Sequence, residues 1–411
     1  MHHSAMTAAV TLDHLRRHAL ARSLFAPTTL PRAIERLGFV QADPIRAPAR
    51  AQDLTLRHRV ADYRAGDLEQ RYPRLAVEED FFVNYGFLPR ATQRLMHPRS
   101  GTSPWTRARR AQAEAVLDFV RERGVVHPRD VDGHFQHGKA RNWFDGSSNA
   151  STQLLDAMHY RGWLRVAGRE GGVRLYAPGA SAPTTPTATT TPALTPASTP
   201  ASPLDSPADP DAVFDALADV VVRKYAPLPE RTLAELVLRL RYGAPQWAHR
   251  RQAALARAKA RLAHTRVDGV TWYWPAGESP MQARHARVAD EARVRLLAPF
   301  DPVVWDRRRF EHFWGWAYRF EAYTPAASRQ RGYYALPLLW RDQVIGWANL
   351  AWRDGRLAAD IGHVSGRPPR ERAFRVALDD ELARMAQFLS PRAVSPRVRP
   401  APRAPALPAS R

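Results

Sequence analysis

The stretch SSNASTQLLDAMHYRGWLRVAGREGGVRLY, residues 147–176, indicates the fold more clearly than any other part of the sequence. Ser147 or Ser148 is suited to N-cap a helix, because a serine side chain can accept a hydrogen bond from the first turn. The helical pattern runs through Met158, and Gly162 stops it. Two short β-type runs joined by a Gly-rich turn come next, which is typical of a hairpin. The sequence therefore predicts a helix that leads directly into a hairpin.

Two more helices are predicted immediately before this stretch. One covers residues 107–123, and a shorter one opens at His127 and continues to about His134. Three helices followed by a two-stranded wing is the order of elements in a winged helix. Residues 104–179 are therefore predicted to form one winged-helix domain.

A similar pattern is found in residues 1–103, at the N-terminal end of the chain. Helices are expected over about 11–22 and 30–37, Gly38 provides a C-cap, and an extended segment follows from 39 to 56. These residues are interpreted as the first winged helix.

The third unit is predicted at residues 211–277. Helices are expected near 211–224, 230–241 and 246–263, followed by a strand-like run at 269–274. The chain thus reads as three winged helices in tandem.

The remaining segments differ in composition. Residues 180–210 are rich in Pro, Thr and Ala and are predicted to be a linker, and residues 391–411 are predicted to be a disordered basic tail. Residues 278–390 contain short β-rich runs and a helix over 370–388, which suggests a small β-barrel. The predicted fold class is α+β, with tandem winged-helix domains followed by a small C-terminal β-barrel.

Charge is the strongest signal in the composition. Lys and Arg number 61 against 40 Asp and Glu, which gives a net charge of +21 and points to a polyanionic partner, DNA or RNA first. A GC-rich genome, which enriches arginine, is the alternative explanation. Only three of the basic residues are lysines: Lys139, Lys224 and Lys259.

Several classes of protein are excluded by composition. The chain has no cysteine, so disulfides, thiolate zinc sites and iron–sulfur clusters are absent. No apolar run is long enough to span a membrane, and no signal segment is found at the N-terminus, so we expect a cytoplasmic, nucleoid-associated protein. His134 and His137 have no further partner at metal-ligand spacing, and no metal or cofactor is expected.

The winged-helix interpretation predicts two sets of DNA contacts. The third helix of such a domain enters the major groove and the wing lies on the backbone. In residues 104–179 this assigns base-side contacts to Ser147, Ser148, Asn149 and Thr152, and wing contacts to Arg165, Arg169 and Arg174. Winged helices also serve as protein-interaction scaffolds, which is the alternative.

Gln41 and Asp43 form the most unusual local pattern. Residues two apart in an extended chain point the same way, and Pro44 keeps Asp43 out of the helical region. An amide and a carboxylate can therefore face one space. An Asp followed by Pro is equally typical of a helix N-cap, and spacing alone favours that interpretation. The arginines that follow, Arg46, Arg50 and Arg57, are predicted DNA contacts.

Two other groups have simpler interpretations. Glu78, Glu79 and Asp80 suggest a solvated helix start, and the aromatic residues between 81 and 87 suggest core packing more than base stacking. Trp305 and nearby aromatic residues are expected to fill the junction between the third unit and the barrel.

Several stretches resemble the winged-helix DNA glycosylases of the AlkZ/YcaQ superfamily, which remove bulky N-alkylated purines and unhook interstrand crosslinks. The stretches are VQADPIRAPAR at 40–50, NWFD at 142–145 continuing through Arg165, LAPFDPVVWDR at 297–307, and YTPAA at 323–327 continuing through RGYYALP at 331–337. The resemblance covers almost the whole chain apart from the 180–210 linker and the tail, and that linker is not a feature we associate with the family. The family's architecture, tandem winged helices with a C-terminal β-barrel, agrees with the pattern described above.

The resemblance implies that Gln41 and Asp43 are catalytic, because Gln41-Ala42-Asp43 matches the family's Gln-x-Asp motif, the form of the YcaQ-like branch. It also implies hydrolysis of N7-alkylguanine-type lesions and crosslinks in double-stranded DNA, as part of base excision repair. We expect a monomer, because damage sites are not palindromic and require no two-fold symmetry. No lysine lies near the motif in sequence, which favours hydrolysis without strand cleavage. A winged-helix transcription regulator and a nonenzymatic DNA-damage binder are the alternatives.

Overall fold

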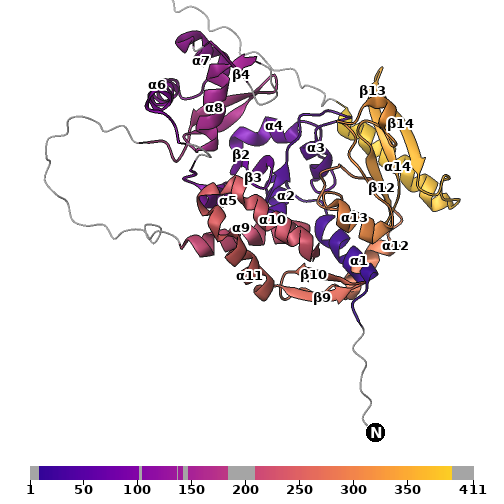
Figure 1. Cartoon of the computed structure of the whole chain (residues 1–411). Coiled ribbons are helices and arrows are strands. Elements are labelled where there is room, and N and C mark those ends of the chain that lie inside the picture. Colours follow the sequence, from indigo (N-terminus) through magenta and orange to yellow (C-terminus); the bar gives the residue numbers. More distant parts are fainter. Residues whose placement is uncertain (1–8, 101–103, 137, 142–146, 184–208, 391–411) are drawn as a thin grey trace, which may run out of the picture.

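The computed structural model describes residues 9–100, 104–136, 138–141, 147–183 and 209–390. The predicted 391–411 tail, most of the predicted linker and His137 lie outside these residues. Helices and small open sheets alternate along the chain, which confirms the α+β prediction (Figure 1). No helix in the described part of the chain is long and apolar enough to cross a membrane.

The first segment contains the helices and the sheet that hold the Gln41 region. Its elements are α1 (Leu12–Ser23), α2 (Leu30–Leu37), β1 (Val40–Gln41), α3 (Ala51–Leu56), α4 (Asp67–Arg71), the 3-10 turn η1 (Tyr72–Arg74), β2 (Val77–Phe81), β3 (Tyr85–Pro89) and α5 (Arg90–Met96). The strands form an antiparallel sheet in the order β1-β3-β2.

Both helices predicted in this segment are confirmed, and Gly38 ends α2 in the left-handed region with φ of 67°. The predicted extended segment, 39–56, is wrong over its last third, where the chain forms α3. All six residues of α3 are buried, so tertiary packing stabilises a helix that has no strong local signal.

The second segment contains α6 (Arg107–Arg123), α7 (Pro128–Phe135), β4 (Lys139–Arg141), β5 (Ser147–Asn149), α8 (Ala150–Tyr160), β6 (Leu164–Glu170) and β7 (Val173–Pro178). The helices and the β6–β7 hairpin match the sequence prediction. The serine cap is wrong: Ser147 and Ser148 belong to β5, and Asn149 occupies the N-cap position of α8 without a side-chain cap bond.

The third segment contains α9 (Pro210–Tyr225), β8 (Leu228–Pro229), α10 (Glu230–Gly243), the 3-10 turn η2 (Pro245–Arg250), α11 (Arg251–Arg261), β9 (Ala263–Val267) and β10 (Val270–Trp274). The strands pair in the order β8-β10-β9. The predicted helices are all found. Assignment of the three segments as winged-helix domains stays a prediction.

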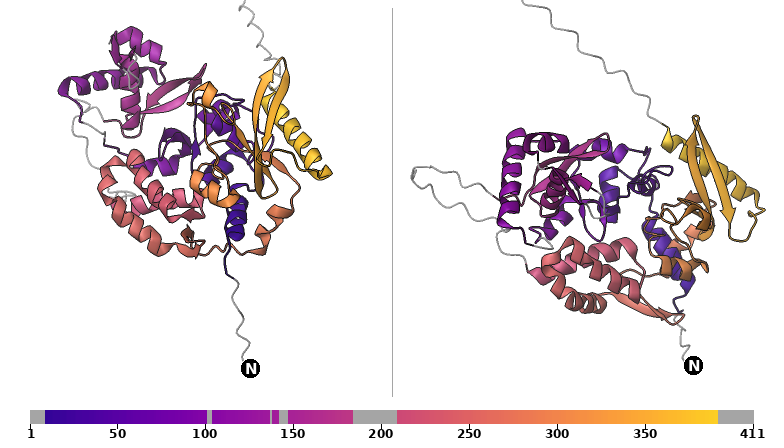
Figure 2. Two further views of the ribbon diagram at one scale, coloured as in Figure 1. Left: turned by 45° about the vertical axis from the view of Figure 1, so that its right-hand side comes forward. Right: turned by 45° about the horizontal axis from the view of Figure 1, so that its top comes forward.

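The last segment contains η3 (Ala283–His285), α12 (Arg287–Asp290), β11 (Val294–Leu296), α13 (Arg307–Trp314), η4 (Ala326–Ser328), β12 (Leu336–Trp340), β13 (Gln343–Arg353), β14 (Arg356–His363) and α14 (Arg372–Leu389). Its four strands form an open antiparallel sheet in the order β11-β12-β13-β14 (Figure 2).

The predicted β-barrel is therefore wrong. Closure would require β14 to pair with β11, but these are the two edges of the sheet. Helix α14 packs against both β11 and β14, so it covers apolar surface that a closed barrel would have enclosed.

Strand β2 joins the first segment to the hairpin of the second through buried charges. Glu78, Glu79 and Asp80 are at most 5% exposed, so the predicted solvated helix start is wrong. Their partners are arginines and a histidine that are distant in sequence: Arg90 and Arg165 for Glu78, Arg169 and Arg174 for Glu79, and Arg99 and His97 for Asp80. Burial alone would raise the pKa of Asp80, but Arg99 and His97 hold it below its usual range.

Candidate functional site

Strand β1 fixes the start of the Gln41–Asp43 segment. Val40 pairs with Phe87 and Gln41 with Gly86 on β3, and the Ala42 amide donates to the Tyr85 carbonyl at 3.0 Å. A Cβ on Gly86 would lie 2.3 Å from the Val40 carbonyl oxygen, so only glycine permits this close pairing. The sheet therefore sets the position from which Gln41 and Asp43 project.

The Gln41 side chain is held by two hydrogen bonds. Its Oε1 accepts from Asn84 Nδ2 at 3.2 Å and from Trp305 Nε1 at 3.1 Å. Asn84 lies in the turn between β2 and β3, and Trp305 comes from the segment before α13. Trp305 was expected only to fill a junction, and the sequence carries no signal for its contact with a residue 264 positions away.

Asp43 does not cap a helix. No helix begins at Pro44, and the next one, α3, starts at Ala51. Instead Asp43 Oδ1 accepts from the Ile45 amide at 2.9 Å, and the Asp43 amide donates to Gln52 Oε1 at 3.3 Å. The carboxylate is half-buried, and this burial raises its pKa, partly opposed by the Ile45 hydrogen bond. The helix-cap interpretation of Asp43 is therefore wrong.

Tyr334 is a neighbour of Asp43 that sequence reasoning missed. Its ring is 2% exposed, and its hydroxyl has no hydrogen-bond partner among the described residues. Burial raises the pKa of Tyr334, and the Asp43 carboxylate raises it further, which places the two groups within electrostatic range. A buried phenol without a hydrogen-bond partner is uncommon, and it distinguishes Tyr334 from the other buried groups around Asp43.

A lysine also approaches the motif, although none does so in sequence. Lys224 on α9 donates from Nζ to the Phe39 carbonyl, two residues before Gln41. Burial lowers the pKa of Lys224 to about 7. The residue is only 4% exposed, so its amine is a structural donor inside the core rather than a group that faces solvent.

The three predicted arginines of the first segment have different environments. Arg46 is exposed and has no ion pair with a described residue. Arg50 pairs with Glu69 at 2.7 Å, and Arg57 forms a buried ion pair with Glu381 of α14. Arg57 is therefore unavailable for DNA in this structure.

The predicted wing arginines also face inward. Arg165 pairs with Glu78 at 3.1 Å, Arg169 pairs with Glu79, and Arg174 lies 2.9 Å from Asp156 and 3.6 Å from Glu79. The prediction treated them as solvent-facing wing residues, but their guanidinium groups balance the buried carboxylates of β2 and Asp156 on α8.

The residues predicted on the third helix of the second segment lie at its start. Ser147 and Ser148 are on β5, and their side chains are outside the described part of the structure. Asn149 is exposed, with Nδ2 donating to Asp132 at 2.7 Å, and Thr152 is partly exposed in the first turn of α8.

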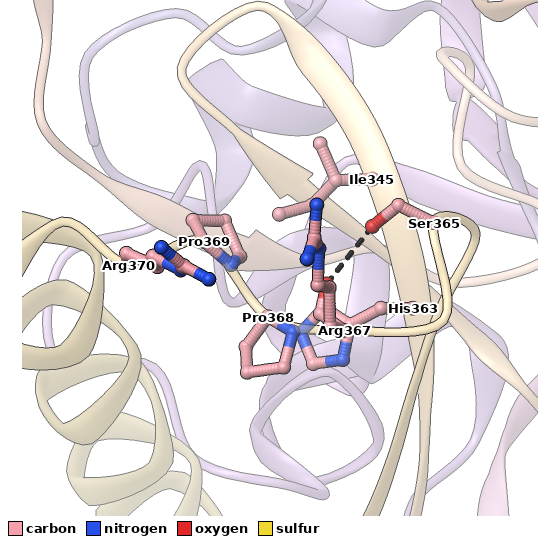
Figure 3. Close-up of a pocket in the computed structure, with 7 residues that line it drawn as sticks. All are labelled: Ile345, His363, Ser365, Arg367, Pro368, Pro369 and Arg370. Carbon is pink, nitrogen blue, oxygen red and sulfur yellow. Dashed lines mark hydrogen bonds between the residues drawn. The ribbon is translucent and has the colours of Figure 1, made fainter.

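No group of three or more potential metal ligands occurs among the described residues. A pocket with a volume of about 510 Å³ lies between the β13–β14 hairpin and the segment that enters α14 (Figure 3). Its lining includes His363, Arg367 and Arg370, but neither Gln41 nor Asp43. The Gln41–Asp43 motif therefore does not lie in this pocket.

Comparison with known proteins relates the chain to a protein family and to a solved structure. A family model described as DNA glycosylase AlkZ-like matches residues 34–388. Among solved structures, the chain is similar to the Streptomyces sahachiroi DNA glycosylase AlkZ, with 15% sequence identity over 93% of this chain and 97% of that chain, and a TM-score of 0.54. At this identity the structural likeness concerns the fold.

Proposed function

The chain belongs to the AlkZ-like DNA glycosylase family, and from this premise we propose that it hydrolyses the N-glycosidic bond of N-alkylated purines in double-stranded DNA. The proposed lesions are of the N7-alkylguanine type, and they include interstrand crosslinks that the enzyme would unhook. The observation that carries the proposal is that a fixed amide, Gln41, and a half-buried carboxylate that caps no helix, Asp43, stand two residues apart where β1 ends.

The chemistry of the bond explains why these two groups suffice. Cleavage passes through an oxocarbenium-like sugar, which a nearby carboxylate stabilises, and the same carboxylate can accept a proton from the attacking water. Oδ1 of Asp43 accepts a hydrogen bond from the Ile45 amide. Oδ2 has no partner among the described residues, and it is the oxygen we assign to this role. An N7-alkylated purine already carries a positive charge, so no general acid is needed to protonate the leaving base.

We further propose hydrolysis without strand cleavage. Strand cleavage requires an amine that attacks the sugar. Of the two lysines whose side chains are described, Lys224 approaches the motif but its amine is buried against the Phe39 carbonyl, and Lys259 pairs with Glu230 on the third segment. This assigns the enzyme to the first step of base excision repair.

The test compares wild-type protein with Asp43→Asn on duplexes that contain N7-methylguanine or a nitrogen-mustard crosslink. We expect wild type to release free base, with strand breaks only after alkali and no borohydride-trapped adduct. Asp43→Asn should lose about 100-fold or more in rate while DNA binding is retained. Asp118→Asn, an exposed position on α6, is the matched control and should keep wild-type activity.

Two results would contradict the proposal. Tight binding without base release by wild type would favour a transcription regulator or a damage binder. Retention of full activity in Asp43→Asn would remove Asp43 from the mechanism.

A further inference from the structure

We propose that Trp305 and Asn84 are positioning residues that hold the Gln41 amide in one orientation, with Nε2 presented as a hydrogen-bond donor to the substrate. This inference rests on the proposed function, because it concerns how the same site acts. It assigns different roles to the two groups of the motif: Gln41 donates and Asp43 accepts.

The orientation follows from the chemistry of the indole ring. An indole N–H can only donate, so the Gln41 atom 3.1 Å from Trp305 Nε1 must be the amide oxygen. Because Asn84 lies 3.2 Å from the same oxygen, its facing atom must be the nitrogen. The alternative flip of either amide would bring two donors or two acceptors together.

Two donors occupy both lone pairs of the Gln41 oxygen. The Nε2 group of Gln41, by contrast, has no partner among the described residues. The free end of the half-buried side chain is therefore a donor, and its ligand must be an acceptor, such as an oxygen of the attacking water or of the nucleotide.

Both positioning residues are themselves fixed. The Trp305 ring packs against Tyr225 with centroids 4.9 Å apart, and the Trp305 amide donates to the Asp301 carbonyl at 2.8 Å. Asp301 in turn forms a fully buried pair with Arg59 at 2.7 Å. The Asn84 carbonyl accepts from the Phe82 amide at 2.8 Å, which closes the turn that carries it. Gln41 is thus held from two rigid parts of the fold.

A double-mutant cycle tests whether the two residues act through Gln41. The readout is the single-turnover rate of 7-methylguanine release by the full chain. Asn84→Ala and Trp305→Phe should each lower the rate about 5- to 10-fold, the usual effect of removing one hydrogen bond. In a Gln41→Ala background the same changes should lower it less than about 2-fold. Trp316→Phe is the matched control, because its indole donates to the Val344 carbonyl and should not alter the rate.

Gln41→Glu tests the donor role directly. Glutamate keeps an oxygen for Asn84 and Trp305 but replaces the free N–H group with a second oxygen. We expect its rate to fall to the level of Gln41→Ala. Full activity of Gln41→Glu, or equal losses in both backgrounds of the cycle, would overturn the inference.

A spectroscopic measurement separates this inference from the proposed function. The indole N–H resonance of Trp305, identified by its absence in Trp305→Phe, should shift in Gln41→Ala whether or not the protein cleaves any substrate. An unshifted signal would overturn the positioning role. A shifted signal from a protein that releases no base would leave the orientation intact and contradict the proposed function alone.

Discussion

At the scale of single residues, the two groups of the motif are held in different ways. Asp43 accepts a hydrogen bond from the Ile45 amide on one oxygen and caps no helix. Gln41 is held by two side chains, Asn84 and Trp305, that the fold brings to it from different segments. The amide is therefore fixed by its partners, whereas the carboxylate keeps one oxygen available.

The raised pKa of Asp43 predicts how activity depends on pH. In the proposed mechanism base release requires the ionised carboxylate, so the rate should fall as pH drops through the Asp43 pKa. Burial raises this pKa, and the midpoint should therefore lie above that of a free aspartate, about 3.9. Single-turnover rates between pH 4 and 8, corrected for spontaneous base loss and checked by circular dichroism for folding, measure it. A rate that stays constant down to pH 4 would contradict the prediction.

Lys224 predicts an unusual dependence of stability on pH. In the folded protein its pKa is lowered to about 7, whereas a lysine in an unfolded chain has a pKa of about 10.4. Between these values the unfolded chain binds more protons, so the folded state gains stability as pH rises. The unfolding free energy of wild type minus that of Lys224→Met should therefore increase from pH 7 to 9.5 in urea titrations.

Lys259→Met provides the control for this prediction. Hydrogen bonding to Glu230 raises the pKa of Lys259, so its variant should not reproduce the increase. A constant difference in unfolding free energy between wild type and Lys224→Met across this range would show that the pKa of Lys224 is not lowered.

At the scale of elements, periodicity and turn residues predicted the helices and the β6–β7 hairpin well. Several failures share one cause, which is dependence on partners distant in sequence. The Glu78–Asp80 run looked solvated because its partners lie up to 95 positions away, on α5, just after α5 and on the hairpin. Helix α3, the ion pairs of the wing arginines and the contacts of Gln41 with Asn84 and Trp305 were not predicted for the same reason.

The ion pairs of β2 predict a large effect for Glu79→Gln. Glu79 is 2% exposed and faces Arg169 and Arg174. Removing its charge leaves Arg174 with Asp156 at 2.9 Å and Arg169 with Glu69 at 3.6 Å as the remaining carboxylates. The two partly buried guanidinium groups are then compensated only in part, and we expect a loss of about 3 kcal/mol in unfolding free energy.

Urea denaturation measures this effect, and Glu114→Gln is the matched control. Glu114 pairs with Arg110 on the exposed face of α6 and should cost no more than about 0.5 kcal/mol. Equal effects of the two changes would show that the β2 pairs are not important for stability.

At the scale of the whole molecule, the predicted units are not independent. One cluster of buried apolar side chains includes Leu54 from α3, Leu154 from α8, Leu336 from β12 and Phe388 from α14. Composition and periodicity could place the segments in order, but they carry no signal for this shared core. The family match over residues 34–388 spans all of these segments.

The distribution of charge along the chain gives the last prediction. Residues 391–411 contain five arginines and no acidic residue, so deleting them lowers the net charge from +21 to +16. Many arginines of the described segments are already paired with carboxylates, such as Arg57, Arg165 and Arg169. The terminal arginines should therefore carry a large share of nonspecific DNA affinity. Each arginine–phosphate contact contributes about 0.9 to the slope of log K against log salt.

We expect deletion of residues 391–411 to lower this slope by up to about 4 on an undamaged duplex, as measured by fluorescence anisotropy across a series of KCl concentrations. A full-length variant with all five arginines changed to glutamine separates charge from chain length and should behave like the deletion. The rate of base release at saturating protein should stay unchanged, because Gln41 and Asp43 are untouched. An unaltered slope in both variants would place the phosphate contacts on the described segments, with exposed Arg46 the first position to change next.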